Sequence, residues 1–406
     1  MLRCKAVRCL CLVGAVVLAV AMVGCAKQSK TTGMKIPGAR VKPLAQPTGE
    51  PYKIGAIFSI TGSEAPLGQP EKETTEMLEK KINQEGGIDG HPLQITIYDT
   101  AGKEDTSVMA VNRLIQMDNV LAIIGPSSTG TTLAVIPIAE KQQVPLVSCA
   151  AAVSITEPVK KWVFKTPQTD AMAVERIFAV LKHRGIQKIA AISASTAFGD
   201  AGLAQMQKQA PAAGIQIVAQ EKFGQTDTDM TTQLTRIKGT PAQAVVCWGT
   251  NPGPATVTKN MKQLGMTIPL FQSHGVANQT YIKLAGEAAE GVMFPAGKLL
   301  VAQSLPDSDP QKKVLLDYKA EFEKAYGKPP DTFGGHAYDA VMMVTDALRK
   351  SGPERAKLRD EIEKTKDFVG IGGVFNMSPT DHNGLTSAAF VMVKIQNGQW
   401  VLAEEQ

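Results

Sequence analysis

The sequence has almost no surplus of charge. Its 43 Lys and Arg residues face 38 Asp and Glu residues. Three of the basic residues, Arg3, Lys5 and Arg8, belong to an N-terminal segment, and without them 40 basic residues face 38 acidic ones. Nucleic-acid binding proteins usually carry a basic patch or stripe on one face, and no basic cluster with interleaved aromatic residues occurs in the rest of the chain. The composition therefore gives no indication of a nucleic-acid partner.

Cysteine is scarce in the part of the chain that is expected to fold. Of six cysteines, three lie in the first 24 residues and Cys25 follows them, which leaves Cys149 and Cys247. Two cysteines do not make a disulfide framework. Both follow short apolar runs, so we expect two buried free thiols, with a disulfide between them as the alternative.

Long apolar runs are missing after Val23. The run 9–23 is shorter than the ~20 residues that a membrane-spanning helix needs. Basic residues before the run, and a glycine and a cysteine after it, are typical of a secretory signal. The cysteine resembles the cleavage point of a bacterial lipobox, although Met22 and Val23 replace the usual residues. We predict a lipoprotein-type signal peptide at 1–24 and lipidation of Cys25; a plain signal peptide and an uncleaved anchor are the alternatives.

Residues 25–50 contain Lys, Gln, Thr, Gly and Pro without apolar periodicity. Such a segment buries too little apolar surface to offset the entropy of ordering it. We predict a flexible tether that holds a soluble body near a membrane surface, outside the cytoplasm.

Catalytic and metal-binding patterns are also missing. The histidines show no zinc-ligand spacing, and no G-x-S-x-G nucleophile elbow occurs. The sequence therefore gives no support for an enzyme, a metal or a cofactor. The five histidines are His91, His183, His274, His336 and His382.

Short apolar runs alternate with amphipathic segments from Tyr52 onward, as in a doubly wound α/β sheet. About 380 residues remain after the signal, which predicts two lobes rather than one. We expect helices at 108–117, 132–141, 170–181, 200–213, 230–238 and 256–264, and a largely helical region at 310–366. We expect strands at 53–60, 93–99, 120–125 and 144–149 in a first set that ends by 162–164, strands at 188–194, 215–223, 244–249 and 268–272 in a second set, and a hairpin of 388–395 and 400–402.

Residues 125–132 read GPSSTGTT and lie between a predicted strand and a predicted helix. The spacing imitates a phosphate-binding loop, but Thr131 stands where the lysine is needed. What remains is a turn of hydroxyl side chains at a helix N-terminus. Ser127, Ser128 and Thr129 with backbone amides there favour an anion such as a carboxylate. An ordinary helix N-cap is the alternative.

Three further turns follow predicted strands. They are the small-residue run 148–154, the turn 248–252 and the turn 272–278, which contains His274. Ligands of open parallel sheets bind beyond the carboxyl ends of strands, so we expect a site there. His274 taken alone is more typical of a hydrogen-bonded loop histidine than of a ligand contact.

A resemblance covers the whole body. Residues 54–62, 82–90, 93–99, 144–147, 198–199, 275–278 and 285–291 are similar to segments of the branched-chain amino acid (Leu/Ile/Val) binding protein family. The resemblance implies two doubly wound parallel-sheet lobes joined by a three-crossover hinge. It assigns 51–167 plus 297–373 to the first lobe and 168–296 plus 374–406 to the second. It also implies a monomer that traps a small ligand and delivers it to an ABC permease.

The resemblance implies a set of pocket residues, several of which depart from the family pattern. The serine turn, here Ser127 to Thr129, holds the ligand carboxylate in the family. A hydroxyl of the next turn is lost at Ala152, which follows Ala150 and Ala151. Family tyrosines fall at Phe198 and near Asn251, and the acid that pairs with the ligand ammonium falls at His274.

The changes at Ala152 and His274 remove two contacts to an amino acid. An ammonium buried without an anionic partner costs ~1–3 kcal/mol or more. We therefore slightly favour a carboxylate ligand without an ammonium, such as an aromatic or aliphatic acid, over an amino acid. A sensory ligand-binding protein and, less favoured, an α/β enzyme remain the alternative functions.

Overall fold

The computed structural model describes residues 46–403. The predicted signal peptide, the predicted lipidation at Cys25 and most of the predicted tether lie outside these residues. At the start of the described chain, the amides of Thr48 and Gly49 donate to the carbonyl of Gly90 at 3.1 and 2.9 Å. Within residues 46–403, no helix has the length and hydrophobicity that crossing a membrane requires.

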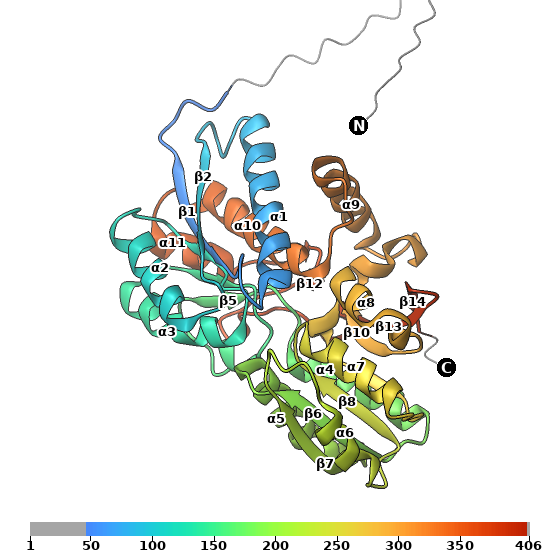
Figure 1. The fold of residues 1–406 in the computed structure, drawn as a ribbon. Coiled ribbons are helices and arrows are strands. Elements are labelled where there is room, and N and C mark those ends of the chain that lie inside the picture. The colour runs from blue at the N-terminus through green and yellow to red at the C-terminus, as the bar shows by residue number, and fades with distance from the viewer. Residues whose placement is uncertain (1–45, 404–406) are drawn as a thin grey trace, which may run out of the picture. The chain divides into compact units, whose positions relative to one another are not determined.

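The first sheet has five parallel strands in the order β2-β1-β3-β4-β5. Alternate residues of β1 belong to different apolar cores: Ile54 and Phe58 pack towards α1, α10 and α11, and Ile57 packs towards α2 and α3. Helices therefore cover both faces, which explains the continuous apolar runs of these strands (Figure 1). The strands are β1 (Tyr52–Phe58), β2 (Leu93–Asp99), β3 (Ile123–Ile124), β4 (Leu146–Ser148) and β5 (Val163–Lys165). The helices are α1 (Ala65–Gln84), α2 (Glu104–Gln116), α3 (Thr129–Gln142), α10 (Thr332–Ser351) and α11 (Arg355–Glu363).

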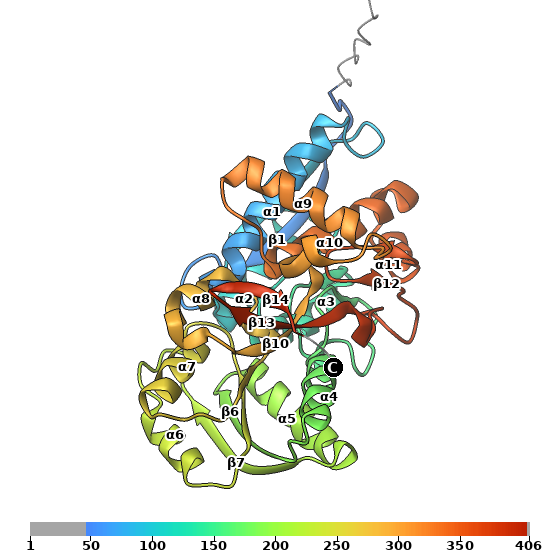
Figure 2. The same cartoon turned by 90° about the vertical axis from the view of Figure 1, so that its right-hand side faces the viewer.

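The second sheet has seven strands in the order β14-β13-β10-β9-β8-β6-β7, of which only β13 runs opposite to the others. Figure 2 shows α4 and α5 on one side of this sheet and α6 and α7 on the other. The strands are β6 (Lys188–Ala194), β7 (Gln216–Phe223), β8 (Ala244–Trp248), β9 (Leu270–Gln272), β10 (Met293–Gly297), β13 (Phe390–Gln396) and β14 (Gln399–Leu402). The helices are α4 (Asp170–His183), α5 (Ala197–Ala213), α6 (Thr231–Lys238), α7 (Gly253–Gln263) and α8 (Gln279–Ala285).

We call the first sheet with its helices lobe 1 and the second sheet with its helices lobe 2. The chain passes from lobe 1 to lobe 2 after Lys165, returns after Gly297, and passes to lobe 2 again after Phe375. Between the last two passages lie α9 (Lys312–Tyr326), α10, α11 and a small hairpin of β11 (Phe368–Val369) and β12 (Val374–Phe375). Short 3₁₀ turns occur at Val153–Ile155, His274–Val276, Gly286–Ala289, Lys298–Ser304 and Ser387–Ala389.

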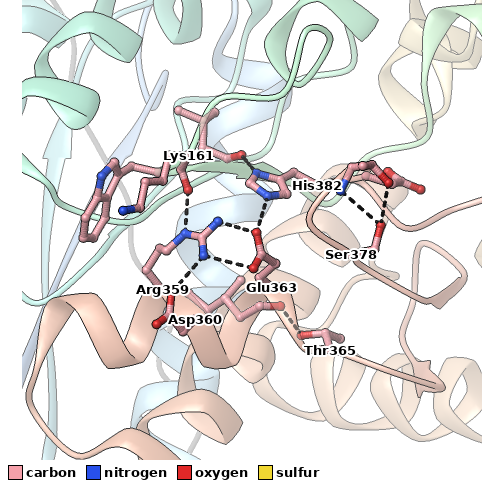
Figure 3. Close-up of polar contacts among 12 residues, drawn as sticks. Lys161, Arg359, Asp360, Glu363, Thr365, Ser378 and His382 are labelled. Atoms are coloured by element: carbon pink, nitrogen blue, oxygen red, sulfur yellow. Dashed lines mark hydrogen bonds and ion pairs between the residues drawn. The ribbon is translucent and has the colours of Figure 1, made fainter.

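A buried cluster of ion pairs and hydrogen bonds links lobe 1 to the segment after Phe375, which is the third passage between the lobes (Figure 3). His382, which is fully buried, bonds the Val163 carbonyl through Nδ1 at 2.8 Å and contacts Glu363 Oε1 through Nε2 at 3.0 Å. Arg359 donates to both oxygens of Glu363 and, through Nε, to the Lys161 carbonyl at 2.7 Å. The cluster thus joins α11, the chain beside β5 and the segment that leads to β13.

The predicted α/β class with two parallel-strand sheets is confirmed. β2 and β6 have the predicted bounds, whereas β3 keeps only two residues of the predicted 120–125. The predicted terminal hairpin is present around Asn397 and Gly398, both of which have positive φ. Cys149 and Cys247 are buried free thiols, as expected. Neither α1 nor β10 was among the predicted elements.

Candidate ligand-binding site

A cavity of about 260 Å³ lies where the two lobes face each other. Most of its wall comes from the turns that follow parallel strands, as expected for open α/β sheets. Lobe 1 supplies the turns after β1, β3 and β4, lobe 2 supplies those after β6, β8 and β9, and α10 adds Phe333 and His336. A ligand in this cavity therefore contacts both lobes.

Two helices begin at the cavity wall, one from each lobe. Helix α3 starts at Thr129, and the side chain of its N-cap residue Ser128 makes no capping hydrogen bond. Helix α5 starts at Ala197, and its N-cap Thr196 accepts from the amide of Gly199 at 3.1 Å. Helix N-termini carry partial positive charge and unpaired amides, so both favour an anionic ligand group.

The hydroxyl of Ser127 is already engaged. Ser127 Oγ accepts from the amide of Ser59 at 3.0 Å and donates to the carboxyl of Glu71. Glu71 belongs to α1 and is fully buried, and its Oε1 has no partner. Burial raises the pKa of Glu71 well above its usual range, although the bond from Ser127 acts in the opposite direction. The hydroxyl of Ser127 therefore stabilises the buried carboxyl of Glu71.

The next two hydroxyls of the turn differ from each other. Ser128 Oγ lies 2.9 Å from Thr131 Oγ1. Thr129 Oγ1 has no partner, and the residue is 2% exposed while it lines the cavity. Thr129 is thus the hydroxyl that is available to a ligand.

Two buried histidines also line the cavity. His274 follows β9 in lobe 2, and His336 lies on α10 in lobe 1. Both ring nitrogens of His274 and Nδ1 of His336 have no partner. Burial lowers the pKa of both imidazoles to about 3, helped by the nearby charge of Lys165. Both rings are therefore neutral at physiological pH.

A buried lysine stands behind the cavity wall. Lys165 is fully buried at the end of β5, and its Nζ donates to the carbonyl of Ala151 at 2.6 Å. Burial lowers its pKa to about 7, although the carboxylate of Asp170 acts in the opposite direction. Any positive charge on Lys165 adds to the preference of this wall for an anion.

Two carboxylates of the cavity lie beside the turn at the start of α3. Glu64 is half-buried, and its Oε2 accepts from Ser59 Oγ at 3.0 Å. Burial raises the pKa of Glu64, and its hydrogen bonds with Ser128 and Ser59 oppose that shift. Glu104 is exposed. These two acids are therefore more exposed to solvent than the two buried histidines.

The structure brings most of the predicted site residues together. Ser127, Ser128, Thr129, Ala150, Ala151, Phe198 and His274 line the cavity. Ala152 packs in the core of lobe 1 instead, and Asn251 donates to Asn278 Oδ1 at 3.2 Å, so that Thr250 lines the cavity in its place.

Other lining residues were not predicted. Glu64 follows β1 and Thr196 follows β6, and the strand-end rule that found the serine turn applies equally to them. His336 lies inside a helix and has no local signal. Within residues 46–403, no three His, Cys, Asp or Glu side chains form a group that could hold a metal ion.

Comparison with known proteins gives one consistent result. The family model of periplasmic binding proteins matches residues 51–399. The leucine-, isoleucine-, valine-, threonine- and alanine-binding protein of Pseudomonas aeruginosa is 26% identical over 302 residues, which cover 74% of this chain and 78% of that protein. Leu/Ile/Val-binding protein homolog 3 of Brucella melitensis is 26% identical over 353 residues, which cover 86% of this chain and 92% of that protein.

Solved structures agree with the sequence relatives. An extracellular ligand-binding receptor from Rhodopseudomonas palustris HaA2 superposes with a TM-score of 0.83 at 29% identity, over 88% of this chain and all of that chain. The branched-chain amino acid transporter substrate-binding protein LivJ of Streptococcus pneumoniae, solved in complex with isoleucine, gives a TM-score of 0.79 at 24% identity, over 87% of this chain and 99% of that chain. The second likeness is one of fold.

Proposed function

Because this chain belongs to the family of periplasmic binding proteins, we propose that it is the ligand-capturing component of an ABC importer of the branched-chain amino acid type. The resemblance to the Leu/Ile/Val-binding proteins is confirmed, and the fold is that of type I periplasmic binding proteins. Family and fold are those of solute-binding proteins, not of enzymes. The family works outside the cytoplasm.

The proposed ligand is a small carboxylate without an ammonium group. The observation that carries this proposal is the start of α3 at the cavity wall, where Thr129 offers a buried hydroxyl without a partner beside uncapped first-turn amides. The N-terminus of α5 from the other lobe and the ammonium of Lys165 behind Ala151 act in the same sense.

The buried end of the cavity suits an ammonium poorly. His274 and His336 are neutral there, and the lining acids Glu64 and Glu104 lie beside the turn at the start of α3. An ammonium buried beside the two imidazoles would lack an anionic partner. A free amino acid is the second candidate ligand, because Glu64 and Glu104 would pair with an ammonium that is held beside that turn.

Calorimetric titration with pairs of ligands that differ only in the ammonium group distinguishes these two candidates. Leucine and 4-methylpentanoate share one carbon skeleton, as do phenylalanine and 3-phenylpropanoate, and only the first of each pair carries an ammonium. We expect the ammonium-free acids to bind more tightly by tenfold or more. Tight leucine binding without any binding of the acids would exclude the proposal. In that case Glu64→Gln and Glu104→Gln should weaken leucine binding, whereas neither change should weaken the binding of a simple acid.

We further propose that the lipidated Cys25 anchors the protein and that 26–50 tethers it within reach of the permease. The basis is the sequence, in which Cys25 follows a short signal-like apolar run. Cys25→Ser should move the protein from the membrane fraction to the soluble fraction and leave ligand affinity unchanged. Retention of this variant in membranes would argue against the anchor.

A further inference from the structure

The cavity contains buried hydrogen-bonding atoms that no part of the protein satisfies. They are both ring nitrogens of His274 and Nδ1 of His336, on residues that are 7% and 5% exposed. A buried polar atom without a partner is costly to keep, and most such atoms in native proteins have one. Since both residues line the cavity, a bound ligand is the partner that can satisfy them.

The two imidazoles come from different lobes and are held by their surroundings. The His274 ring lies among Phe198, Trp248 and Phe390, with ring centroids 5.4, 5.8 and 5.3 Å away. His336 lies on α10, where its backbone carbonyl accepts from Thr166 Oγ1 at 2.9 Å. Both rings line the same cavity. They therefore form a polar patch in a wall whose aromatic residues are Phe198 and Phe333.

The hydrogen-bonding character of the patch selects its partner. A neutral imidazole has one N–H donor and one acceptor nitrogen. A carboxylate only accepts and an ammonium only donates, so either would leave part of the pair unsatisfied. The positive charge of Lys165 near both rings further disfavours an ammonium. A hydroxyl group both donates and accepts, and it is uncharged.

We propose that His274 and His336 together bind a hydroxyl group of the ligand, so that the ligand is a hydroxy acid with an apolar, aromatic-compatible body. This inference rests on the proposed function, because the carboxylate end is assigned to the turn at Thr129. The hydroxyl donates to one imidazole nitrogen and accepts from the N–H of the other ring. Phe198 beside His274 and Phe333 beside His336 line the cavity and contact the body of the ligand.

Two pairs of probes test the subsite. They are 3-phenylpropanoate with 3-(4-hydroxyphenyl)propanoate, and benzoate with 4-hydroxybenzoate. Within at least one pair the full-length protein should bind the hydroxylated acid tenfold or more tightly, measured as the ratio of the two dissociation constants. His336→Leu and His274→Leu should each reduce this ratio to within about threefold of one.

His336→Asn keeps one donor and one acceptor and is the matched control, since it should retain part of the hydroxyl preference. Circular dichroism and melting temperature show whether each variant is folded, and the ratio is used because it cancels a general loss of affinity. Acids that bind without a hydroxyl preference, or a preference that survives both leucine variants, would overturn the subsite while leaving the proposed function intact. Leucine binding with no binding of any of the four acids would overturn the proposed function and the subsite together.

Discussion

At the scale of single residues, two hydroxyl side chains at the start of α3 differ in their hydrogen bonding. Ser127 bonds the fully buried Glu71, whereas Thr129 Oγ1 has no partner and faces the cavity. Thr129→Val should lower the affinity for a carboxylate ligand about tenfold and leave stability unchanged or slightly raised, because it removes an unpaired group. Ser127→Ala should lower the free energy of unfolding by ~1–3 kcal/mol, because it leaves Glu71 without its partner.

Urea unfolding followed by circular dichroism, together with calorimetric titration, separates these two effects. Equal losses of stability in the two variants would contradict the assignment of Thr129 to the ligand. Glu71→Gln is a useful companion, because burial keeps the pKa of Glu71 high. A neutral isostere there should cost less stability than Ser127→Ala.

The two buried histidines make stability depend on pH. Their folded pKa is about 3, against about 6.5 in the unfolded chain. Between these values the unfolded state binds more protons, so the free energy of unfolding rises with pH and is lost as pH falls from about 6.5 towards 3. At pH 5 each histidine should cost about 2 kcal/mol relative to pH 7.5.

The double variant His274→Gln/His336→Gln isolates this contribution. Asp331 and Asp339 have folded pKa values raised to about 7 and about 8 by burial, and they act in the opposite sense because they retain protons in the folded state. They are common to both proteins, so they cancel in the difference. Urea titrations at pH 7.5 and 5.0 should show the wild type losing more stability than the variant, and parallel losses would argue that the imidazoles titrate normally.

Sequence reasoning reaches the site residues that lie at strand ends. Ser127, Phe198 and His274 all follow apolar runs, and the carboxyl ends of parallel strands meet at one edge. It does not predict the hydrogen bond between Ser127 and Glu71, because Glu71 lies 56 residues away and only the folded chain brings the two together. His336 is missed for the same reason, since nothing in α10 distinguishes it from a core residue.

At the scale of elements, the ionic cluster around Glu363 joins α11 to the third passage between the lobes (Figure 3). Arg359 is 9% exposed at its side chain and His382 is fully buried. Glu363→Ala should lower the free energy of unfolding by ~1–3 kcal/mol, because it leaves Arg359 with Asp360 as its remaining anionic partner and removes the partner of His382 Nε2. The exposed pair Lys313–Asp317 on α9 provides the control. Lys313→Ala should change stability by less than ~0.5 kcal/mol in the same urea experiment, and similar effects of the two changes would contradict the structural role of the cluster.

The elements that sequence reasoning misses share a cause. Helix α1 carries Pro70 and a polar buried side that includes Glu71, Thr74 and Thr75, so its apolar periodicity is weak. Strand β10 contains Pro295, which argues against a central strand from sequence alone. In both cases tertiary packing supplies what local pattern lacks: α1 packs against α10, and β10 pairs with β13.

At the scale of the whole molecule, neither lobe contains the site alone. Lobe 1 supplies Thr129 and His336, and lobe 2 supplies His274 and the start of α5. A ligand that binds only the folded protein stabilises it by mass action. Since the ligand's contacts come from both lobes, that stabilisation depends on the hydrogen bonds that fix the position of one lobe's contact residues relative to the other's.

One such bond joins the two histidine-bearing segments. Thr332 Oγ1, at the start of α10, donates to the carbonyl of Ala277, in the loop that carries His274, at 3.1 Å. Thr332→Val removes this bond and keeps the shape of the side chain. We expect about three- to tenfold weaker binding of the probe acid, because the two imidazoles are no longer held in fixed relation.

Thr345→Val is the matched control, because Thr345 lies in the same helix, is also buried and has a hydroxyl without a partner. Its removal breaks no bond between the lobes, so affinity should stay within twofold of the wild type while stability is unchanged or raised. Calorimetric titration of both variants decides the matter. If Thr332→Val and Thr345→Val bind the acid alike, the register of the two lobes is set elsewhere, and the affinity of the cavity does not depend on this contact.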